Sequence, residues 1–216
     1  GGDWFDYVDN PEGGWLGVAD AKGRGTRAAG LAAVGLGAFR AARHGEMRLA
    51  QAGRLIHETM VEVGDGAYLR GVIGRWHGPT STFAWITAEG PPPLVVDADG
   101  RLGQLEDGVN PPFGHWEDDL EPEVGWRRIA AGERLVLYTD GLTDRRRASG
   151  EPIGVEGFRA AVRAAAPTSA AATVRALEDA VVAASSQPLD DDATLIVLVP
   201  NTPTTRTENG VVGQRP

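Results

Sequence analysis

The order of helical and strand-like segments restricts the fold of this chain more than any other feature of its sequence. Apolar residues recur with helical spacing in two segments near the start, 26–43 and 46–63, and in two near the end, 155–166 and 169–184. Short apolar segments separated by Gly and Pro turns lie between these two pairs. Such an order lacks the strand–helix alternation of a parallel sheet. It predicts an α+β fold in which mostly antiparallel sheets are covered by helices.

The expected strands are short, and two of them end at an acid. We expect strands at 15–20, 68–76, 81–87, 94–96, 101–105, 134–139 and 194–199. Asp20 closes the first of these strands, and Asp140 directly follows 134–139. The segment Asp97-Ala98-Asp99-Gly100 has the composition of a hairpin turn. Ser169 is expected to cap the last helix.

Length and charge indicate one acidic domain. A chain of 216 residues with 42% hydrophobic content predicts a single sizeable domain, which we place at residues 1–200. The polar, Thr-rich segment 201–216 is expected to be a disordered tail. A net charge of -9 argues against a nucleic-acid partner, which would need a basic face. Since no apolar run reaches about 18 residues and no signal segment opens the chain, we expect a cytoplasmic protein without membrane insertion.

Several kinds of catalytic chemistry are excluded by what the chain lacks. It contains no cysteine, which rules out disulfides, thiolate zinc sites and cysteine nucleophiles. Its 4 histidines are scattered, with no pair at metal-ligand spacing. A histidine-rich metal site or a Ser-His-Asp triad is therefore not expected. Carboxylates could hold hard cations if they gather, so their positions decide which chemistry remains.

Acids occur at four places beside an apolar strand or a Gly turn. These are Asp3, Asp20, Asp140 and the run Asp190-Asp191-Asp192. Carboxylates that converge at rigid strand ends repel one another unless cations neutralise them, and Mg²⁺ or Mn²⁺ suits such an oxygen-rich site. The alternative is that they are ordinary turn residues, because Asp favours turns. The position that the whole set shares favours a cation site.

Five short motifs carry a resemblance to a known family. They are Gly1-Gly-Asp-Trp-Phe-Asp6, Ala19-Asp-Ala-Lys-Gly-Arg-Gly25, Pro91-Pro-Pro-Leu94, Leu137-Tyr-Thr-Asp-Gly-Leu-Thr-Asp144 and Asp190-Asp-Asp-Ala-Thr-Leu195. In this order they resemble the sporulation-type (SpoIIE-like) branch of the PP2C-like (PPM) serine/threonine phosphatases of bacteria. The resemblance implies an αββα sandwich of two mostly antiparallel sheets flanked by helices.

The same resemblance implies a site and a reaction. Asp20 would bridge two Mn²⁺ or Mg²⁺ ions, and the carbonyl of Ala21 would join their coordination shell. Asp140 and Asp191 would hold the second ion, and Asp3 would act on the first. Asp20, Asp140 and Asp191 would thus support catalysis by a metal-activated water.

Partners follow from the resemblance as well. The expected substrate is phosphoserine or phosphothreonine on a regulatory protein, such as an anti-sigma factor antagonist. A sensor domain upstream and a homodimer are the other partners that the resemblance implies.

Two departures leave an alternative open. The family usually carries Asn-Ala-Gly-His where this chain has Thr87-Ala88-Glu89-Gly90, and Ala19 replaces a Gly before Asp20. The first departure removes a polar loop near the site. It supports the alternative of a weak or inactive pseudophosphatase that acts as a binding or regulatory module. The acids retained at all four places oppose this alternative and favour the enzyme. Lys22, the sole lysine, could either meet a phosphate in its glycine turn or be a solvated turn cation.

Overall fold

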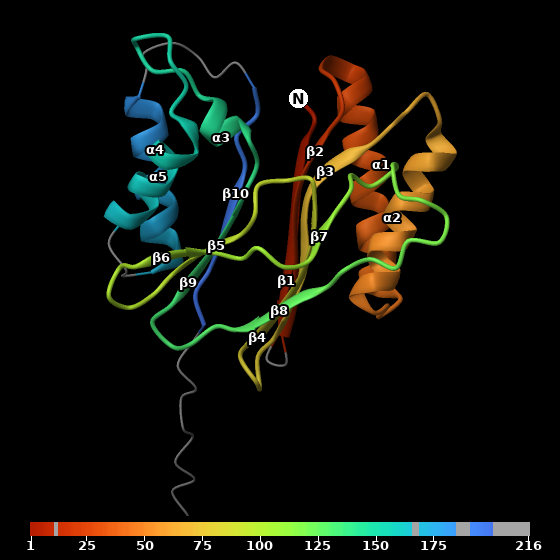
Figure 1. Cartoon of the computed structure of the whole chain (residues 1–216), viewed down its shortest axis with the longest axis horizontal. Coiled ribbons are helices and arrows are strands. Elements are labelled where there is room, and N and C mark those ends of the chain that lie inside the picture. Colours follow the sequence, from red (N-terminus) through yellow and green to blue (C-terminus); the bar gives the residue numbers. More distant parts are fainter. Residues whose placement is uncertain (11–12, 166–168, 185–190, 201–216) are drawn as a thin grey trace, which may run out of the picture.

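The chain folds into four layers. The computed structural model describes residues 1–10, 13–165, 169–184 and 191–200. Two β-sheets face each other in the middle, and helices cover the outer face of each sheet (Figure 1). This arrangement confirms the α+β sandwich that the sequence predicts.

The first sheet contains the N-terminal strands. It runs in the order β1 (Asp3–Asn10), β2 (Gly13–Ala21), β3 (Leu69–His77), β4 (Thr82–Ala88) and β7 (Val109–Asn110), and β8 (Gly125–Arg128) also pairs with β4. All of these pairs are antiparallel except β4 with β7. Strand β2 is buried along almost its whole length because both faces of the sheet are covered.

The second sheet is smaller and antiparallel throughout. Its order is β10 (Leu195–Leu198), β9 (Arg134–Tyr138), β5 (Leu94–Val96) and β6 (Leu102–Gln104). Side chains from both sheets form the core between them, including Val18, Val72, Trp85, Leu135 and Leu137. This packing holds the ends of β2 and β9 near each other.

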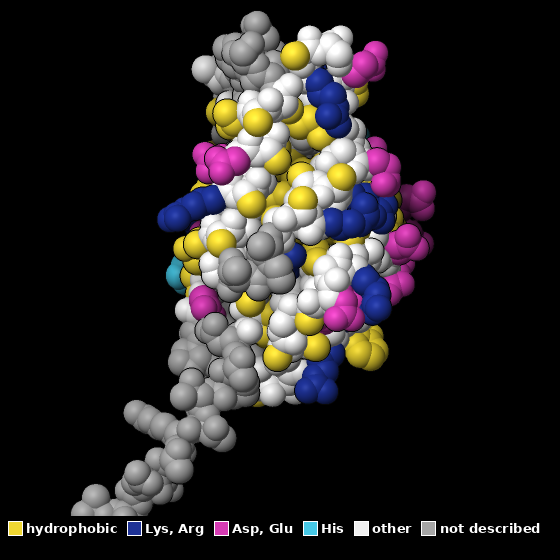
Figure 2. All heavy atoms as spheres, turned by 90° about the vertical axis from the view of Figure 1, so that its left-hand side faces the viewer, with side chains coloured by type: hydrophobic (Ala, Val, Ile, Leu, Met, Phe, Trp, Pro, Cys, Tyr) yellow, Lys and Arg dark blue, Asp and Glu magenta, His cyan; other side chains and the backbone are white. Residues whose placement is uncertain are grey.

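Each helix pair packs on one sheet. Helices α1 (Gly25–His44) and α2 (Leu49–Val63) cover the first sheet, with Phe39 and Ile56 fully buried. Helices α4 (Gly154–Ala164) and α5 (Ala170–Ala183) cover the second, and the short α3 (Gly141–Asp144) precedes them. Ser169 accepts a hydrogen bond from the backbone N–H of Ala172, which confirms the predicted cap. Basic and acidic side chains are interspersed over the α4–α5 face (Figure 2).

Some elements differ from the sequence-based expectation. Strand β1 was not predicted as a strand because its apolar residues do not alternate cleanly with polar ones. Strands β7 and β8 and helix α3 are too short to leave a periodic pattern. Helix α2 begins at Leu49 rather than Glu46, since the backbone of Glu46 has a φ of 50° and cannot continue a helix. The predicted tail 201–216 lies outside the described residues.

Among the helices in the described ranges, none combines the length and the hydropathy needed to cross a bilayer.

Candidate metal and phosphate site

Asp20 stands at the centre of a row of charged residues across the first sheet. Its backbone pairs with Asp3 on β1 and with Arg70 on β3. Directly paired residues of antiparallel strands project their side chains to the same face. Two acids and one base are thus brought side by side from three strands.

A glycine allows β1 to approach the end of β2 closely. The N–H of Ala21 donates to the carbonyl of Gly2 at 3.0 Å. A Cβ atom on Gly2 would lie 2.7 Å from the Ala21 carbonyl oxygen and 2.9 Å from a carboxylate oxygen of Asp20. The absence of a side chain at Gly2 therefore sets the distance between the Gly-Gly-Asp segment and the Asp20 turn.

The second sheet supplies Asp140, at the point where β9 ends and α3 begins. Its carbonyl accepts the N–H groups of Thr143 and Asp144, each at 2.8 Å, which fixes the turn. A Cβ atom on Gly141 would overlap the carbonyl oxygen of Asp192. Gly141 thus lets the Asp140 turn lie directly against the segment that carries Asp191.

Asp20, Asp140 and Asp191 line one pocket of about 210 Å³. They come from three segments that are far apart in the sequence. Four arginines also line the pocket, together with Gly141 and Asp144; they are Arg24, Arg70, Arg145 and Arg146. The structure therefore brings together three of the acids that the sequence singled out. Asp190 lies outside the described residues.

Asp3 lies beside this pocket and links the two sheets. Its carboxylate accepts a hydrogen bond from the hydroxyl of Thr139 at 2.7 Å. The same hydroxyl oxygen accepts the N–H of Thr194 at 3.0 Å. The N–H of Asp3 donates to a carboxylate oxygen of Asp192 at 3.3 Å.

Arg70 joins the two sheets through two carboxylates. Its Nη2 donates to Oδ2 of Asp20 at 3.1 Å and to Oδ2 of Asp140 at 2.8 Å. All three side chains are partly buried, with 35% of Arg70, 21% of Asp20 and 35% of Asp140 exposed. Partial burial weakens screening by water, so this three-way contact is stronger than an ordinary surface ion pair.

Burial and crowding of acids raise two pKa values. Burial, helped by the charges of Asp20 and Asp192, raises the pKa of Asp3 to about 6, against the lowering effect of its threonine hydrogen bonds. Burial also raises the pKa of Asp20, and the charges of Asp140 and Asp191 act in the same direction. Arg70 opposes the increase in the pKa of Asp20. The charged forms of Asp3 and Asp20 are therefore incompletely compensated, and a cation beside them would stabilise both.

The donor atoms suit a hard divalent ion. The carboxylates of Asp20, Asp140 and Asp191, which line the pocket, are the ligand type that Mg²⁺ and Mn²⁺ prefer. The backbone carbonyl of Ala21, the residue after Asp20, is of a suitable type as well. Within the part of the chain that the structure describes, no three acidic or histidine side chains are gathered closely enough to hold a metal ion as they stand. The chemical type of the side chains suits such an ion, and Arg70 forms ion pairs with two of them, Asp20 and Asp140.

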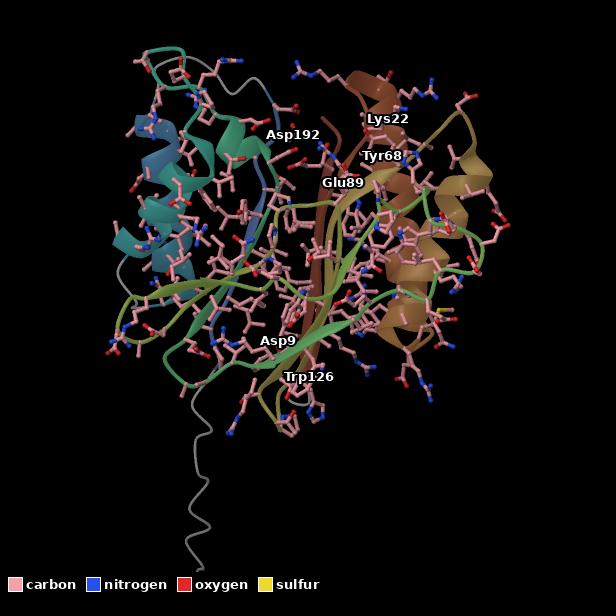
Figure 3. All side chains as sticks on the ribbon, in the orientation of Figure 1. Asp9, Lys22, Tyr68, Glu89, Trp126 and Asp192 are labelled. Carbon is pink, nitrogen blue, oxygen red and sulfur yellow. The ribbon has the colours of Figure 1, made fainter. Side chains whose placement is uncertain are left out.

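Sequence reasoning missed Arg70 and Thr139 as parts of this site. The only available signal was their position, since Thr139 immediately precedes Asp140 and Arg70 belongs to a predicted strand. Lys22 donates to the carbonyl of Gly66 at 3.2 Å and lies over the ring of Tyr68 at 5.2 Å. These contacts give Lys22 a structural role in its turn. In Figure 3, Lys22 and Tyr68 lie at the same end of the sandwich as Asp192.

The segment Thr87-Ala88-Glu89-Gly90, which differs from the family motif, forms the end of β4 and the two residues after it, and it meets β3 next to Arg70. Glu89 forms a bridge with Gly71 and has a φ of 47°. A Cβ atom on Gly90 would lie 2.7 Å from the Cα of Gly71. This segment therefore packs directly against Gly71, the residue after Arg70, and the close contact requires a glycine at position 90.

A larger cavity lies elsewhere and has a different character. It has a volume of about 1200 Å³ and is lined mainly by apolar residues, including Phe5 and Tyr7 of β1 and Ile196 and Leu198 of β10. Charged groups that could act on a substrate are concentrated in the smaller pocket, which we therefore regard as the candidate site.

Comparison with solved structures defines the class of the protein. The RsbU and RsbW domains of Rv1364c from Mycobacterium tuberculosis match with a TM-score of 0.77 and 26% identity, over 94% of this chain and 58% of that chain. The SiaA-PP2C domain of Pseudomonas aeruginosa matches with a TM-score of 0.80 and 19% identity, over 92% of this chain and 80% of the SiaA chain. RsbX in complex with magnesium matches with a TM-score of 0.68 and 15% identity, over 91% of this chain and 85% of the RsbX chain. The chain has the fold of a PP2C-type phosphatase domain.

Within the PP2C-type phosphatase domains, the chain can be assigned to one family. The family model for Stage II sporulation protein E (SpoIIE) matches residues 10–200. The chain belongs to the SpoIIE family, which confirms the resemblance found in its motifs. It spans little more than half of the Mycobacterium tuberculosis chain that it matches.

Proposed function

We propose that this domain is a metal-dependent protein phosphatase that hydrolyses phosphoserine or phosphothreonine. The observation that carries the proposal is the convergence of Asp20, Asp140 and Asp191 on one pocket from three distant segments. Converging carboxylates are costly without a cation, and the raised pKa values of Asp20 and of neighbouring Asp3 reflect that cost. The PP2C-type fold and the magnesium in RsbX support the same proposal.

Each acid has a distinct part in this proposal. Asp20 and the carbonyl of Ala21 would contact two Mn²⁺ or Mg²⁺ ions, Asp140 and Asp191 would hold the second ion, and Asp3 would act on the first. When bound, such ions lower the pKa of a water and neutralise charge on a phosphoryl group. The chain itself positions Asp20 at the end of β2 and Asp140 just after β9.

Basic residues around the pocket suit a phosphorylated substrate. Arg24 is 76% exposed and lies 3.5 Å from Asp191, and Arg146 is exposed at the same rim. Arginine pairs well with phosphoryl oxygens because its N–H groups match their geometry. We infer that these arginines attract the phosphorylated residue, while the carboxylates hold the ions.

The proposed substrate is a regulatory phosphoprotein, such as an anti-sigma factor antagonist. The matched chain that joins RsbU and RsbW domains supports a place in regulation by protein partners. We further propose that an upstream sensor domain or a dimer contact acts through α1 and α2. Helix α1 begins at Gly25, just after the Asp20–Ala21 turn, so its movement would displace both residues.

The proposal is tested by hydrolysis of p-nitrophenyl phosphate and of a phosphoserine peptide. Turnover should require added Mn²⁺ or Mg²⁺ and should stop in excess EDTA. Undiminished activity in EDTA would contradict the proposal. The matched control is Asp119→Asn, which removes one exposed carboxylate in the loop beside α2 and should leave turnover unchanged.

A pseudophosphatase is the second candidate. The observation that favours it is the engagement of Asp20 and Asp140 by Arg70, next to the changed loop at Glu89. Inactivity of the folded domain with every divalent metal, together with specific binding of a phosphoprotein partner, would support this candidate over the enzyme.

A further inference from the structure

Arg70 holds a position that a cation between two acids would take. A single nitrogen, Nη2, contacts Oδ2 of both Asp20 and Asp140. Asp20 belongs to the first sheet, and Asp140 follows the second. The guanidinium therefore joins two acids from opposite sides of the pocket through one positive charge.

The charge of Arg70 is permanent. Arginine stays protonated at any pH at which the domain folds, so the contact cannot be relieved by loss of a proton. A divalent ion that uses both Asp20 and Asp140 would meet this charge at contact distance. Like charges at such a distance repel strongly in a partly buried site.

The rest of the guanidinium is available for another contact. Only Nη2 of Arg70 has a hydrogen-bond partner among the described residues. Arg70 also retains 35% exposure and lines the pocket. Its Nε and Nη1 could therefore donate to an oxyanion in the pocket without any change in the fold.

We propose that Arg70 is the built-in counter-cation of this site, and that metal ions bind by displacing its guanidinium from Asp20 and Asp140. The inference rests on the proposed function, because it concerns the ions proposed there. Once displaced, Arg70 points its free N–H groups at the phosphoryl group of the substrate. The contact thus stabilises the metal-free domain, lowers its affinity for metal, and supplies a phosphate-binding residue after loading.

Calorimetric titration with Mn²⁺ tests the displacement. Arg70→Gln should bind Mn²⁺ at least about tenfold more tightly than wild type, because a repelling charge has been removed. Arg70→Lys keeps the charge and should remain within a few-fold of wild type. Arg75→Gln is the matched control, since Arg75 is an exposed arginine farther along β3 that lies over the ring of Trp15; its Mn²⁺ affinity should equal that of wild type.

Thermal melts give a second readout that does not depend on turnover. In EDTA, Arg70→Gln should melt below wild type and below Arg75→Gln, because Asp20 and Asp140 lose their shared counter-charge. Saturating Mn²⁺ should close most of that gap. A metal-free melting temperature equal to or above that of wild type would overturn the counter-cation role.

Kinetics separate the phosphate contact from a purely structural effect. At saturating Mn²⁺, Arg70→Gln should raise KM for a phosphoserine peptide more than it lowers kcat, and Arg70→Lys should restore KM in part. An unchanged KM would remove the phosphate-binding part of the proposal.

The outcomes distinguish this inference from the proposed function. If wild type and Arg70→Gln bind Mn²⁺ equally, or the variant binds more weakly, the displacement is wrong and the metal-dependent function stands. If only the variant binds Mn²⁺, the inference is supported, and the domain is a pseudophosphatase blocked by its own arginine. If neither binds, both proposals fail.

Discussion

Asp3 and Asp20 are direct cross-strand partners, with their backbones paired on β1 and β2. Two carboxylates on the same face of neighbouring strands destabilise a sheet unless something compensates their charge. Thr139 and Arg70 provide that compensation, the first by donating to Asp3 and the second by donating to Asp20. The fold therefore tolerates an unfavourable pair at the place where the proposed ions would bind.

The pH dependence of metal-free stability should reveal this pair. The folded-state pKa of Asp3 is about 6, above its ordinary value of 3.8, so the folded state binds the proton more tightly. Its contribution to the free energy of unfolding is complete below about pH 4 and is lost as the pH rises through about 6. The loss is at most about 3 kcal/mol.

Asp3→Asn isolates that contribution, since its amide oxygen can still accept from Thr139. Chemical denaturation in EDTA at several pH values should show equal or lower stability for the variant near pH 4 and higher stability than wild type near pH 7. Parallel curves for the two proteins across this range would show that Asp3 titrates normally.

How far the site could be predicted depends on what each residue's role requires. Asp20 and Asp140 were recognisable because each follows an apolar strand and precedes a turn, which is a local pattern. The role of Arg70 depends on the register of β2 with β3, and sequence alone does not specify which residues of two strands meet. The hydrogen bond from Thr139 to Asp3 depends on the distance between the two sheets, which is set by their packing.

The fold shows the same limit. The long helices and buried strands were predictable from their periodicity, whereas β1 has Phe5 and Tyr7 exposed and its strand character comes from pairing with β2. Local patterns therefore identified the elements, and long-range pairing decided which of their charged residues meet.

Asp20→Asn tests the central position of that acid. Mn²⁺ binding should weaken at least about tenfold, which is the usual effect of removing a metal ligand or a residue that supports one. Turnover should be lost, because the substitution removes a carboxylate charge from the pocket while nearly preserving the side-chain volume. Metal-free stability should hold or rise, since Asp3 and Asp140 lose a repelling neighbour.

Asp119→Asn is a better control for this experiment than Asp144→Asn, because Asp144 lines the same pocket. The measurements are Mn²⁺ calorimetry and thermal melts with and without metal. Wild-type Mn²⁺ affinity in Asp20→Asn would mean that the ligand assignment has to be rebuilt.

Gly141→Ala tests the contact between the Asp140 turn and the Asp192 backbone. The added methyl group would overlap the Asp192 carbonyl oxygen, so the segment with Asp191 must move away. We expect a loss of about 2 kcal/mol or more in unfolding free energy and weaker Mn²⁺ binding. Gly103→Ala is the control, because its Cβ would meet only the Val95 carbonyl oxygen, at 4.0 Å. Equal Mn²⁺ affinity in both variants would show that the two acidic segments are held together by other contacts.

Two glycines of α1 should respond oppositely to the same substitution. Gly37 is exposed, and nothing lies within 4 Å of a Cβ atom built on it. Gly37→Ala should therefore raise the unfolding free energy by about 0.5–1 kcal/mol through helix propensity alone.

Gly35 is buried, and a Cβ atom there would overlap Cδ1 of Leu69, the residue before Arg70. Gly35→Ala should cost about 1–3 kcal/mol by overpacking, and the displaced Leu69 should also alter Mn²⁺ affinity by shifting Arg70. Urea denaturation and Mn²⁺ calorimetry on both variants check this. Equal stabilisation by the two substitutions would mean that α1 packs on β3 loosely enough to accept the extra methyl, and that α1 does not control the position of Arg70.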